Sequence, residues 1–171
     1  MLTSSVLNRG LYRARQLGSA LRPNVRRRDR RQARTHLGET LYPLFRSMQP
    51  VDQRHCLDVY NLLRSQDCRD AEMLTAALIH DAGKGRLADA RIGVLDRVAY
   101  TALEHAAPGL LARLASRWRG LSDLRRHPQR GLRLAREHGA PEGVITLLAA
   151  MDGAAKADER ARVLMAADDA C

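Results

Sequence analysis

The stretch AALIHDAGKG at residues 76–85 is the most informative part of the chain. It starts as an apolar helical run and ends in the adjacent pair His80 and Asp81, followed by Gly83 and Lys84. Glycine is common just past the end of a helix, so the pattern predicts that this helix ends at Gly83. A histidine and a carboxylate are thereby expected where an apolar helix stops. Whether His80 and Asp81 belong to a functional site depends on residues elsewhere in the chain.

Helical periodicity dominates the chain after its first 34 residues. Apolar residues recur three or four positions apart, and no strand-like alternation persists. Pro128 is expected at the first position of one helix and Gly139 just past its end. The sequence therefore predicts an all-α fold, a single bundle of about seven helices. Because 45% of the residues are hydrophobic and only 4% are aromatic, its core is expected to be mostly Leu, Ala and Val.

The net charge of +10 is concentrated near the start of the chain. Residues 1–34 hold ten arginines and one acid, whereas residues 35–171 hold 19 basic and 18 acidic residues. These numbers divide the chain into an Arg-rich N-terminal arm, residues 1–34, and a helical domain, residues 35–171. A solvated helix or tail is the favoured interpretation of the arm, with a presequence or a contact to nucleic-acid phosphates as alternatives. A base-stacking platform is disfavoured because Tyr12 is the only aromatic residue there.

Composition disfavours several classes of protein. No apolar run approaches the roughly 20 residues needed to span a bilayer, so no membrane span is expected. Cys56, Cys68 and Cys171 are odd in number and lack the C-x-x-C spacing of zinc ribbons. Free thiols in a reducing compartment are therefore expected, and with them a cytoplasmic location. The sequence also lacks a Gly-rich phosphate loop and a nucleophile-elbow serine.

Two imidazoles and two carboxylates are the candidate ligands of a metal ion. His55 and His80 fall on the apolar stripes of two predicted helices, and Asp81 follows at a helix end. Asp168 comes directly after the apolar run VLMAA of the last helix. This mixture of nitrogen and oxygen ligands suits one divalent transition metal, Mn²⁺, Fe²⁺, Co²⁺, Ni²⁺ or Zn²⁺. Each histidine alone is more readily a hydrogen-bonded core residue, so the prediction depends on the set.

Four short motifs resemble those of a known family. DQRH at 52–55, AALIHDAGKG at 76–85 and RVLMAADDA at 162–170 resemble the spaced H…HD…D pattern of the HD superfamily. Its members are all-helical, metal-dependent phosphohydrolases. HPQRG at 127–131 resembles a further motif, H-P-x-x-G, of the branch that contains HD-GYP phosphodiesterases and small HDIG domains. The resemblance covers about residues 36–171, and the GYP signature is absent.

The resemblance implies a role for each matching residue. The metal ligands would be His55, His80, Asp81 and Asp168. The catalytic residues would be Asp81 and Lys84, with Lys84 meeting the phosphate oxygens. His127 would be a second-metal or supporting residue, and a histidine at the N-terminal cap of a helix is the alternative.

A departure from the family pattern favours one metal over two. The helix after HPQRG ends in Ala150 and Met151, where two-metal members carry histidine, and only Asp152 lies nearby. The resemblance therefore implies a one-metal phosphohydrolase acting on a phosphate-containing small molecule, preferably a nucleotide. The alternative is a degenerate HD domain that binds a nucleotide or a metal without turnover. A third, less favoured possibility is a nucleic-acid binder that uses the basic arm.

Overall fold

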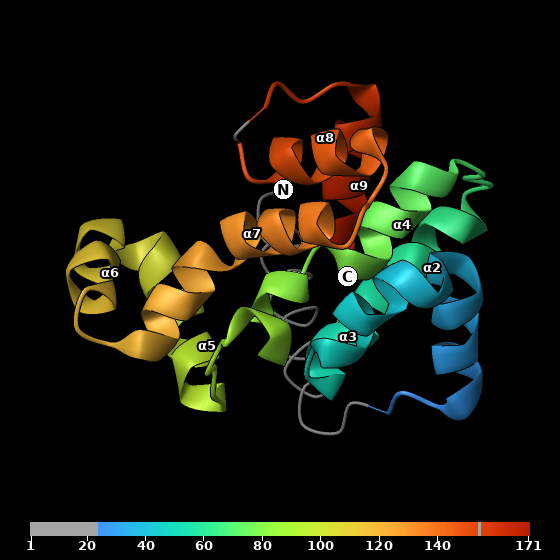
Figure 1. Cartoon of the computed structure of the whole chain (residues 1–171). Helices are drawn as coiled ribbons and strands as arrows, with labels where there is room; N and C mark the ends of the chain where they lie inside the picture. Colours follow the sequence, from blue (N-terminus) through green and yellow to red (C-terminus); the bar gives the residue numbers. More distant parts are fainter. Residues whose placement is uncertain (1–23, 154) are drawn as a thin grey trace, which may run out of the picture.

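The structure is a computed structural model that describes residues 24–153 and 155–171, so most of the predicted arm lies outside the described residues. All regular structure in these two ranges is helical, which confirms the predicted all-α class (Figure 1). Eight α-helices and two 3₁₀ turns are present there. In chain order they are α2 (Arg27–Ser47), α3 (Pro50–Ser65), α4 (Ala71–Ile79), η1 (Ala82–Lys84), η2 (Arg86–Ala88), α5 (Val94–Ala106), α6 (Pro108–Ala115), α7 (Arg119–Glu137), α8 (Glu142–Met151) and α9 (Glu159–Ala170).

Helix α2 joins the basic segment to the body of the protein. It is divided at Gly38, whose φ of +64° lies in the left-handed region that glycine adopts most easily. Ala33 and Leu37, before this kink, are both buried in the core. Residue 34, after which the sequence predicts a boundary, lies within α2, where Ala33 reaches the core and most of residues 27–34 are exposed.

The body is built around α4, whose residues from Met73 to Ile79 are all buried. Helices α2, α3, α8 and α9 surround it, together with the second half of α7. Each surrounding helix contributes large buried side chains, and leucine and alanine predominate in the core. Burial of one such leucine contributes about 1.5–3 kcal/mol, so this core holds the body together. Representative core residues are Phe45, Leu57, Leu78, Leu147 and Leu164.

A smaller lobe projects from the body. It consists of α5, α6 and the first turns of α7, and it extends to the left in Figure 1. Its own core contains only three buried residues, Leu111, Ala115 and Leu121. The second half of α7 packs on the body, so this helix connects the two cores. No helix in the described part of the chain is long and apolar enough to cross a membrane.

Helix α7 begins earlier than predicted. It starts at Arg119, and Pro128 lies in its interior, so the prediction that Pro128 opens the helix is wrong. Proline lacks the N–H that would bond to the carbonyl of Leu124, four residues earlier. That carbonyl instead accepts a hydrogen bond from Nδ1 of His127, which offsets part of the loss. The helix ends before Gly139, as predicted, with a φ of +68° at that glycine.

Gly83 has a different role from the one predicted. Helix α4 ends at Ile79, and Gly83 lies in the 3₁₀ turn η1 without a positive φ. A Cβ atom on Gly83 would overlap the backbone carbonyl of His127 and lie 2.7 Å from the nitrogen of Gly131. A Cβ atom on Gly131 would in turn lie 3.2 Å from the nitrogen of Gly83. The two glycines therefore allow the backbones of η1 and α7 to touch.

Candidate metal centre

One cavity of about 280 Å³ collects the residues that the sequence marks as candidates. It lies where α3, the end of α4, η1, α7, α8 and α9 meet. All six predicted site residues line it, and the remainder of the lining is apolar. The six are His55, His80, Asp81, Lys84, His127 and Asp168, and the apolar residues are Pro128, Leu132, Leu148 and Met151.

Helices α3 and α9 bring His55 and Asp168 together. His55 Nε2 lies 2.7 Å from Asp168 Oδ1, and His80 Nε2 lies 3.2 Å from the same oxygen. The two imidazole rings meet edge to face with their centroids 5.2 Å apart. Asp169, the next residue along α9, is exposed. The ligand atoms of His55, His80 and Asp168 lie within 4.8 Å of one another, so this set can hold a metal ion.

The end of α4 fixes the orientation of His80. The last carbonyls of a helix have no intrahelical donor, and that of Ala77 accepts a hydrogen bond from His80 Nδ1 over 3.0 Å. A neutral imidazole that donates from Nδ1 carries a lone pair on Nε2. Histidine ligands of metals are commonly oriented by such a bond on the other ring nitrogen.

The Nε2 atom of His80 is therefore the atom that most requires a cation. It is buried and has no hydrogen-bond partner among the described residues. Two carboxylate oxygens lie near it, Asp168 Oδ1 at 3.2 Å and Asp81 Oδ1 at 3.8 Å. A buried lone pair facing two carboxylates, of which Asp81 is buried and Asp168 partly exposed, is unfavourable unless a proton or a metal ion lies between them. The residues present thus fit a divalent cation.

The dipeptide His127-Pro128 places a third imidazole on the opposite side of Asp81. Because Pro128 frees the carbonyl of Leu124, His127 Nδ1 donates to that carbonyl. Its Nε2 atom then faces Asp81 Oδ1 at 3.4 Å. The close contact between Gly83 and α7 fixes this separation, because it holds the carbonyl of His127 against η1.

Asp81 and Lys84 form a buried ion pair at the floor of the cavity. Lys84 Nζ lies 2.8 Å from the carboxylate of Asp81, whose side chain is only 3% exposed. Burial disfavours the charged form of Asp81, but Lys84, His80 and His127 outweigh it and hold its pKa well below the usual range. Burial likewise lowers the pKa of Lys84, but the carboxylates of Asp81 and Asp52 more than compensate and raise it. Asp81 is therefore an anion whose charge is largely balanced by the protein.

The pKa values of Asp168 and His80 also reflect burial opposed by neighbouring charges. Burial raises the pKa of Asp168, but the adjacent imidazoles of His55 and His80 have the larger effect and lower it. Burial lowers the pKa of His80, but Cys56 Sγ and the carboxylates of Asp81 and Asp168 raise it well above the usual range. Without a metal, His80 therefore retains a proton where a cation would otherwise bind.

Cys56 is a neighbour of the site that the sequence did not mark. It is fully buried, its Sγ lies 3.8 Å from His80 Nδ1, and it forms a second group of possible ligands with His80 and Asp81. Burial raises the pKa of its thiol, so the thiolate that a metal needs is disfavoured. Since His80 Nδ1 already donates to Ala77, the set with His55 and Asp168 fits a cation better. No sequence motif distinguishes Cys56 from an ordinary core thiol.

The apolar wall of the cavity lies where a second metal would need ligands. Met151 lines the cavity at the end of α8, as its position in the sequence indicates. The carboxylate of Asp152 accepts two hydrogen bonds of 2.9 Å from Gln129 and does not line the cavity. Among the described residues, the groups of possible ligands lie on the His80 side, so the geometry favours one cation.

Comparison with models of protein families, with curated proteins and with solved structures finds no match for this chain. The function must therefore be argued from the site itself. Its elements are three imidazoles, two ionised carboxylates, one ammonium group and an apolar wall around a small cavity. Such a site can hold a metal ion and place one positive side chain beside it.

Proposed function

We propose that this protein is a metal-dependent phosphohydrolase of the HD superfamily that acts on a nucleotide or another small phosphate ester. The observation that carries the proposal is the buried Nε2 atom of His80, which has no hydrogen-bond partner and faces two carboxylates. The three motifs of the H…HD…D pattern and the HPQRG motif together contribute all six polar residues of one cavity, which supports the family resemblance.

His55, His80 and Asp168 would hold the cation, with Asp81 beside them. The ligand set of two imidazoles and a carboxylate suits a transition metal such as Mn²⁺, Fe²⁺ or Zn²⁺. A divalent cation held by these residues would supply Lewis acidity. Ala77 supports the ligand set by holding His80 in the required tautomer.

Lys84 and Asp81 perform the other steps of the proposed reaction. Lys84 is cationic at neutral pH because its pKa is raised, so its ammonium group can neutralise charge that develops on phosphoryl oxygens. Asp81 is ionised, and its carboxylate accepts a hydrogen bond from the attacking water and orients it. His127 Nε2, 3.4 Å from Asp81 Oδ1, restricts the orientation of that carboxylate.

The size and lining of the cavity limit the substrate. A volume of about 280 Å³ is at the lower end of the range for ligand pockets, about 300–1,000 Å³. It accommodates a phosphoryl group with a small organic part. Pro128, Leu132, Leu148 and Met151 offer an apolar surface to that organic part. A small nucleotide would suit both the size of the cavity and its apolar lining, with its base lying against these side chains.

Metal content is the first test of the proposal. The purified protein should contain close to one transition metal ion per chain by inductively coupled plasma mass spectrometry. His80→Ala should reduce occupancy at least about tenfold, because it removes the central ligand. His138→Ala is the matched control, since His138 bonds to the carbonyl of Leu134 at the end of α7 and does not line the cavity. Absence of metal, with none taken up from added Mn²⁺, contradicts the proposal.

A binding module without turnover is the second candidate. It is favoured by one observation, the ion pair between Lys84 and Asp81, which occupies both residues that the hydrolytic reaction requires. The Mn²⁺-loaded protein should hydrolyse p-nitrophenyl phosphate or its bis ester if the hydrolase proposal is right, and Asp81→Asn should abolish this activity. Stoichiometric metal and nucleotide binding without hydrolysis of any phosphate ester would favour the binding module.

A further inference from the structure

Exposed apolar side chains gather in one part of the molecule. Seven large apolar side chains are exposed among the described residues, and six of them lie between residues 87 and 118. The seventh, Val163, is on α9 in the body. The small lobe therefore exposes more large apolar side chains than the three residues that it buries. The six are Leu87, Val94, Leu95, Val98, Leu110 and Trp118.

Four of these side chains form one surface, which we call the α5 patch. Val94, Leu95 and Val98 belong to the first two turns of α5 and are 72%, 76% and 50% exposed. Trp118 is joined to the same turns because its Nε1 donates to Asp96 Oδ1 over 2.6 Å. Among the residues of α5 whose burial the structure describes, 94–104 and 106, none is completely covered by the rest of the protein. The α5 patch is thus an apolar surface with an indole ring at its edge.

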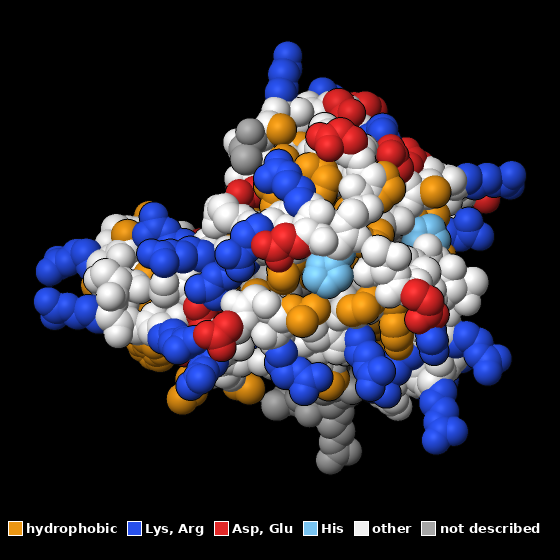
Figure 2. All heavy atoms as spheres, in the orientation of Figure 1, with side chains coloured by type: hydrophobic (Ala, Val, Ile, Leu, Met, Phe, Trp, Pro, Cys, Tyr) orange, Lys and Arg blue, Asp and Glu red, His pale blue; other side chains and the backbone are white. Residues whose placement is uncertain are grey.

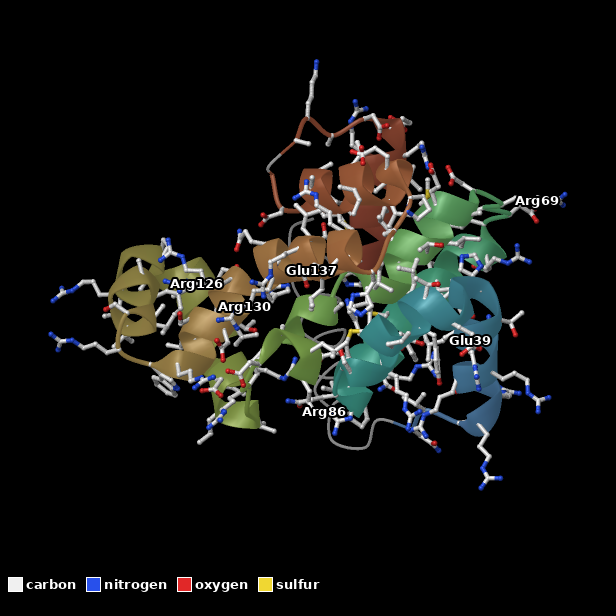
Figure 3. All side chains as sticks on the ribbon, viewed as in Figure 1. Glu39, Arg69, Arg86, Arg126, Arg130 and Glu137 are labelled. Atoms are coloured by element: carbon white, nitrogen blue, oxygen red, sulfur yellow. The ribbon has the colours of Figure 1, made fainter. Side chains whose placement is uncertain are left out.

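Positive charge surrounds this lobe. Residues 86–138 hold eleven arginines and five acids, whereas the rest of residues 35–171 holds eight basic and thirteen acidic residues. Figure 2 shows Lys and Arg side chains gathered over the lobe and α7, and Figure 3 labels Arg86, Arg126 and Arg130 among them. The charges of residues 35–171 therefore nearly cancel in sum, although residues 86–138 are positive and the remainder is negative.

The arginines nearest the α5 patch in sequence are available for binding. Arg86, Arg91 and Arg117 are exposed and form no ion pair with any residue that the structure describes. The acids between them already have partners. Asp89 pairs with Arg119 at 2.7 Å, and Asp96 accepts hydrogen bonds from Trp118 and from the backbone of Gly93. The surface offers unpaired cations near apolar side chains in sequence. Of these two acids, Asp89 is paired with an arginine, whereas Asp96 is hydrogen-bonded to neutral donors and keeps its charge.

We propose that the α5 patch attaches the protein to the surface of an anionic phospholipid bilayer. Val94, Leu95 and Val98 lie on α5, while Trp118 and the arginines come from the segments beside it in sequence. Exposed aliphatic side chains, a tryptophan and arginines on one surface are a combination that binds in the membrane interface without crossing it. Val94, Leu95 and Val98 enter the boundary of the acyl chains, and the indole of Trp118 lies at the level of the headgroups. Arg86, Arg91 and Arg117 bind lipid phosphates of the anionic surface.

Charge argues against a second copy of the chain as the occupant. In a two-fold dimer the same surface meets itself, so the unpaired arginines around the α5 patch would face one another. Like charges in close contact are unfavourable, whereas lipid phosphates are complementary to them.

Trp118 makes the proposal directly measurable because it is the only tryptophan in the chain. The full-length protein is mixed with vesicles of phosphatidylcholine alone or with about one third phosphatidylglycerol. The anionic vesicles should sediment the protein and shift the Trp118 emission to shorter wavelength, and high salt should weaken both effects. The neutral vesicles should bind it only weakly.

Variants of exposed residues test the surface without disturbing the fold. Leu95→Ser with Val98→Ser should weaken binding at least about tenfold, because apolar area no longer enters the bilayer. Arg91→Gln with Arg117→Gln should weaken binding to anionic vesicles and leave the small neutral binding unchanged. Val163→Ser, at the exposed apolar position outside the lobe, is the control and should bind like the parent. Circular dichroism checks that each variant remains helical.

Three results would overturn the proposal. The first is no sedimentation and no emission shift with either vesicle. The second is vesicle binding that the Leu95 and Val98 substitutions leave unchanged. The third is self-association in analytical ultracentrifugation, without vesicle binding, that these substitutions abolish, because the α5 patch would then bind a second copy of the chain.

Discussion

The body and the α5–α6 lobe differ in how completely they bury their apolar side chains. In the body, α4 is covered on all sides, and the candidate metal site lies where six elements meet. In the lobe, three buried residues support two helices whose apolar side chains remain largely exposed. The comparison shows that the same helical periodicity serves two purposes. In the body it brings His55, His80 and Asp168 to one cavity, and in the lobe it leaves apolar side chains exposed.

The largest expected effect comes from adding one methyl group to the body at Gly83. Gly83→Ala should cost about 3 kcal/mol or more, because the new Cβ atom would overlap the backbone of α7 at His127. The matched control is Gly109→Ala in the lobe, where no atom lies within 4 Å of the new Cβ. That change should be neutral or stabilise α6 by about 0.5–1 kcal/mol. Urea unfolding measures both, and equal midpoints would contradict the backbone contact between η1 and α7.

Removing the ion pair that joins the lobe to the body should have the next largest effect on the free energy of unfolding. Arg97 of α5 donates two hydrogen bonds of 2.8 and 2.9 Å to Asp52 of α3, whose carboxylate is 2% exposed. Asp52→Ala leaves Arg97 without this partner and should cost about 2–3 kcal/mol. Glu159→Ala removes the partner of Arg162 in an exposed pair and is the control, with little change expected. A similar loss of stability in both variants would mean that the buried pair does not hold the lobe to the body.

A third prediction concerns the pH dependence of the metal-free body. The lowered pKa values of Asp81 and Asp168 stabilise the fold above the ordinary carboxyl pKa of about 4, and this contribution is lost as the pH falls. The raised pKa of His80 stabilises it below the ordinary imidazole pKa of about 6.5, and this contribution is lost as the pH rises through the raised value. Metal-free stability should therefore decline on both sides of mildly acidic pH.

Urea midpoints measured from acid to alkaline pH test this dependence. Added Mn²⁺ should abolish the alkaline decline, because the cation replaces the proton on His80. His80→Gln should lack that decline even without metal. A metal-free protein whose stability does not change with pH would show that the charges of Asp81, Asp168 and His80 are not coupled.

The smallest expected effect on stability is in the α5 patch. Leu95→Ser should change the free energy of unfolding by less than about 0.5 kcal/mol, because the side chain is 76% exposed. Leu121→Ala in the buried core of the same lobe should cost about 2–4 kcal/mol. A large loss in Leu95→Ser would mean that the chain itself covers this side chain, which would remove the surface available for binding.

Sequence patterns predicted the fold class well because the periodicity of the body is strong. The sequence also predicted that His55, His80, Asp81 and Asp168 would converge, and all four line one cavity. Their convergence follows from their positions on apolar stripes that pack around one core.

Other features depended on contacts that a linear sequence does not reveal. The predicted position of Pro128 in its helix was wrong because proline more often lies at the first position of a helix. The hydrogen bond from His127 that compensates for it here is specific to this site. The role of Gly83 depends on a neighbour 48 residues away, Gly131, which no local pattern indicates. Helical periodicity over the residues of α5 is the same whether or not another element covers their apolar side chains. Only the structure shows that they are exposed.

The contact between His55 and Asp168 also has a consequence for the kinetics of folding. These residues are 113 positions apart, so the chain must close a long loop before both can reach one cation. Closing so long a loop costs entropy, so we expect this contact to form after the main barrier to folding. A bound metal should therefore leave the folding rate almost unchanged and slow unfolding in proportion to its affinity. The metal would then determine the lifetime of the native state once it has formed, and the speed of folding would depend on the local helices.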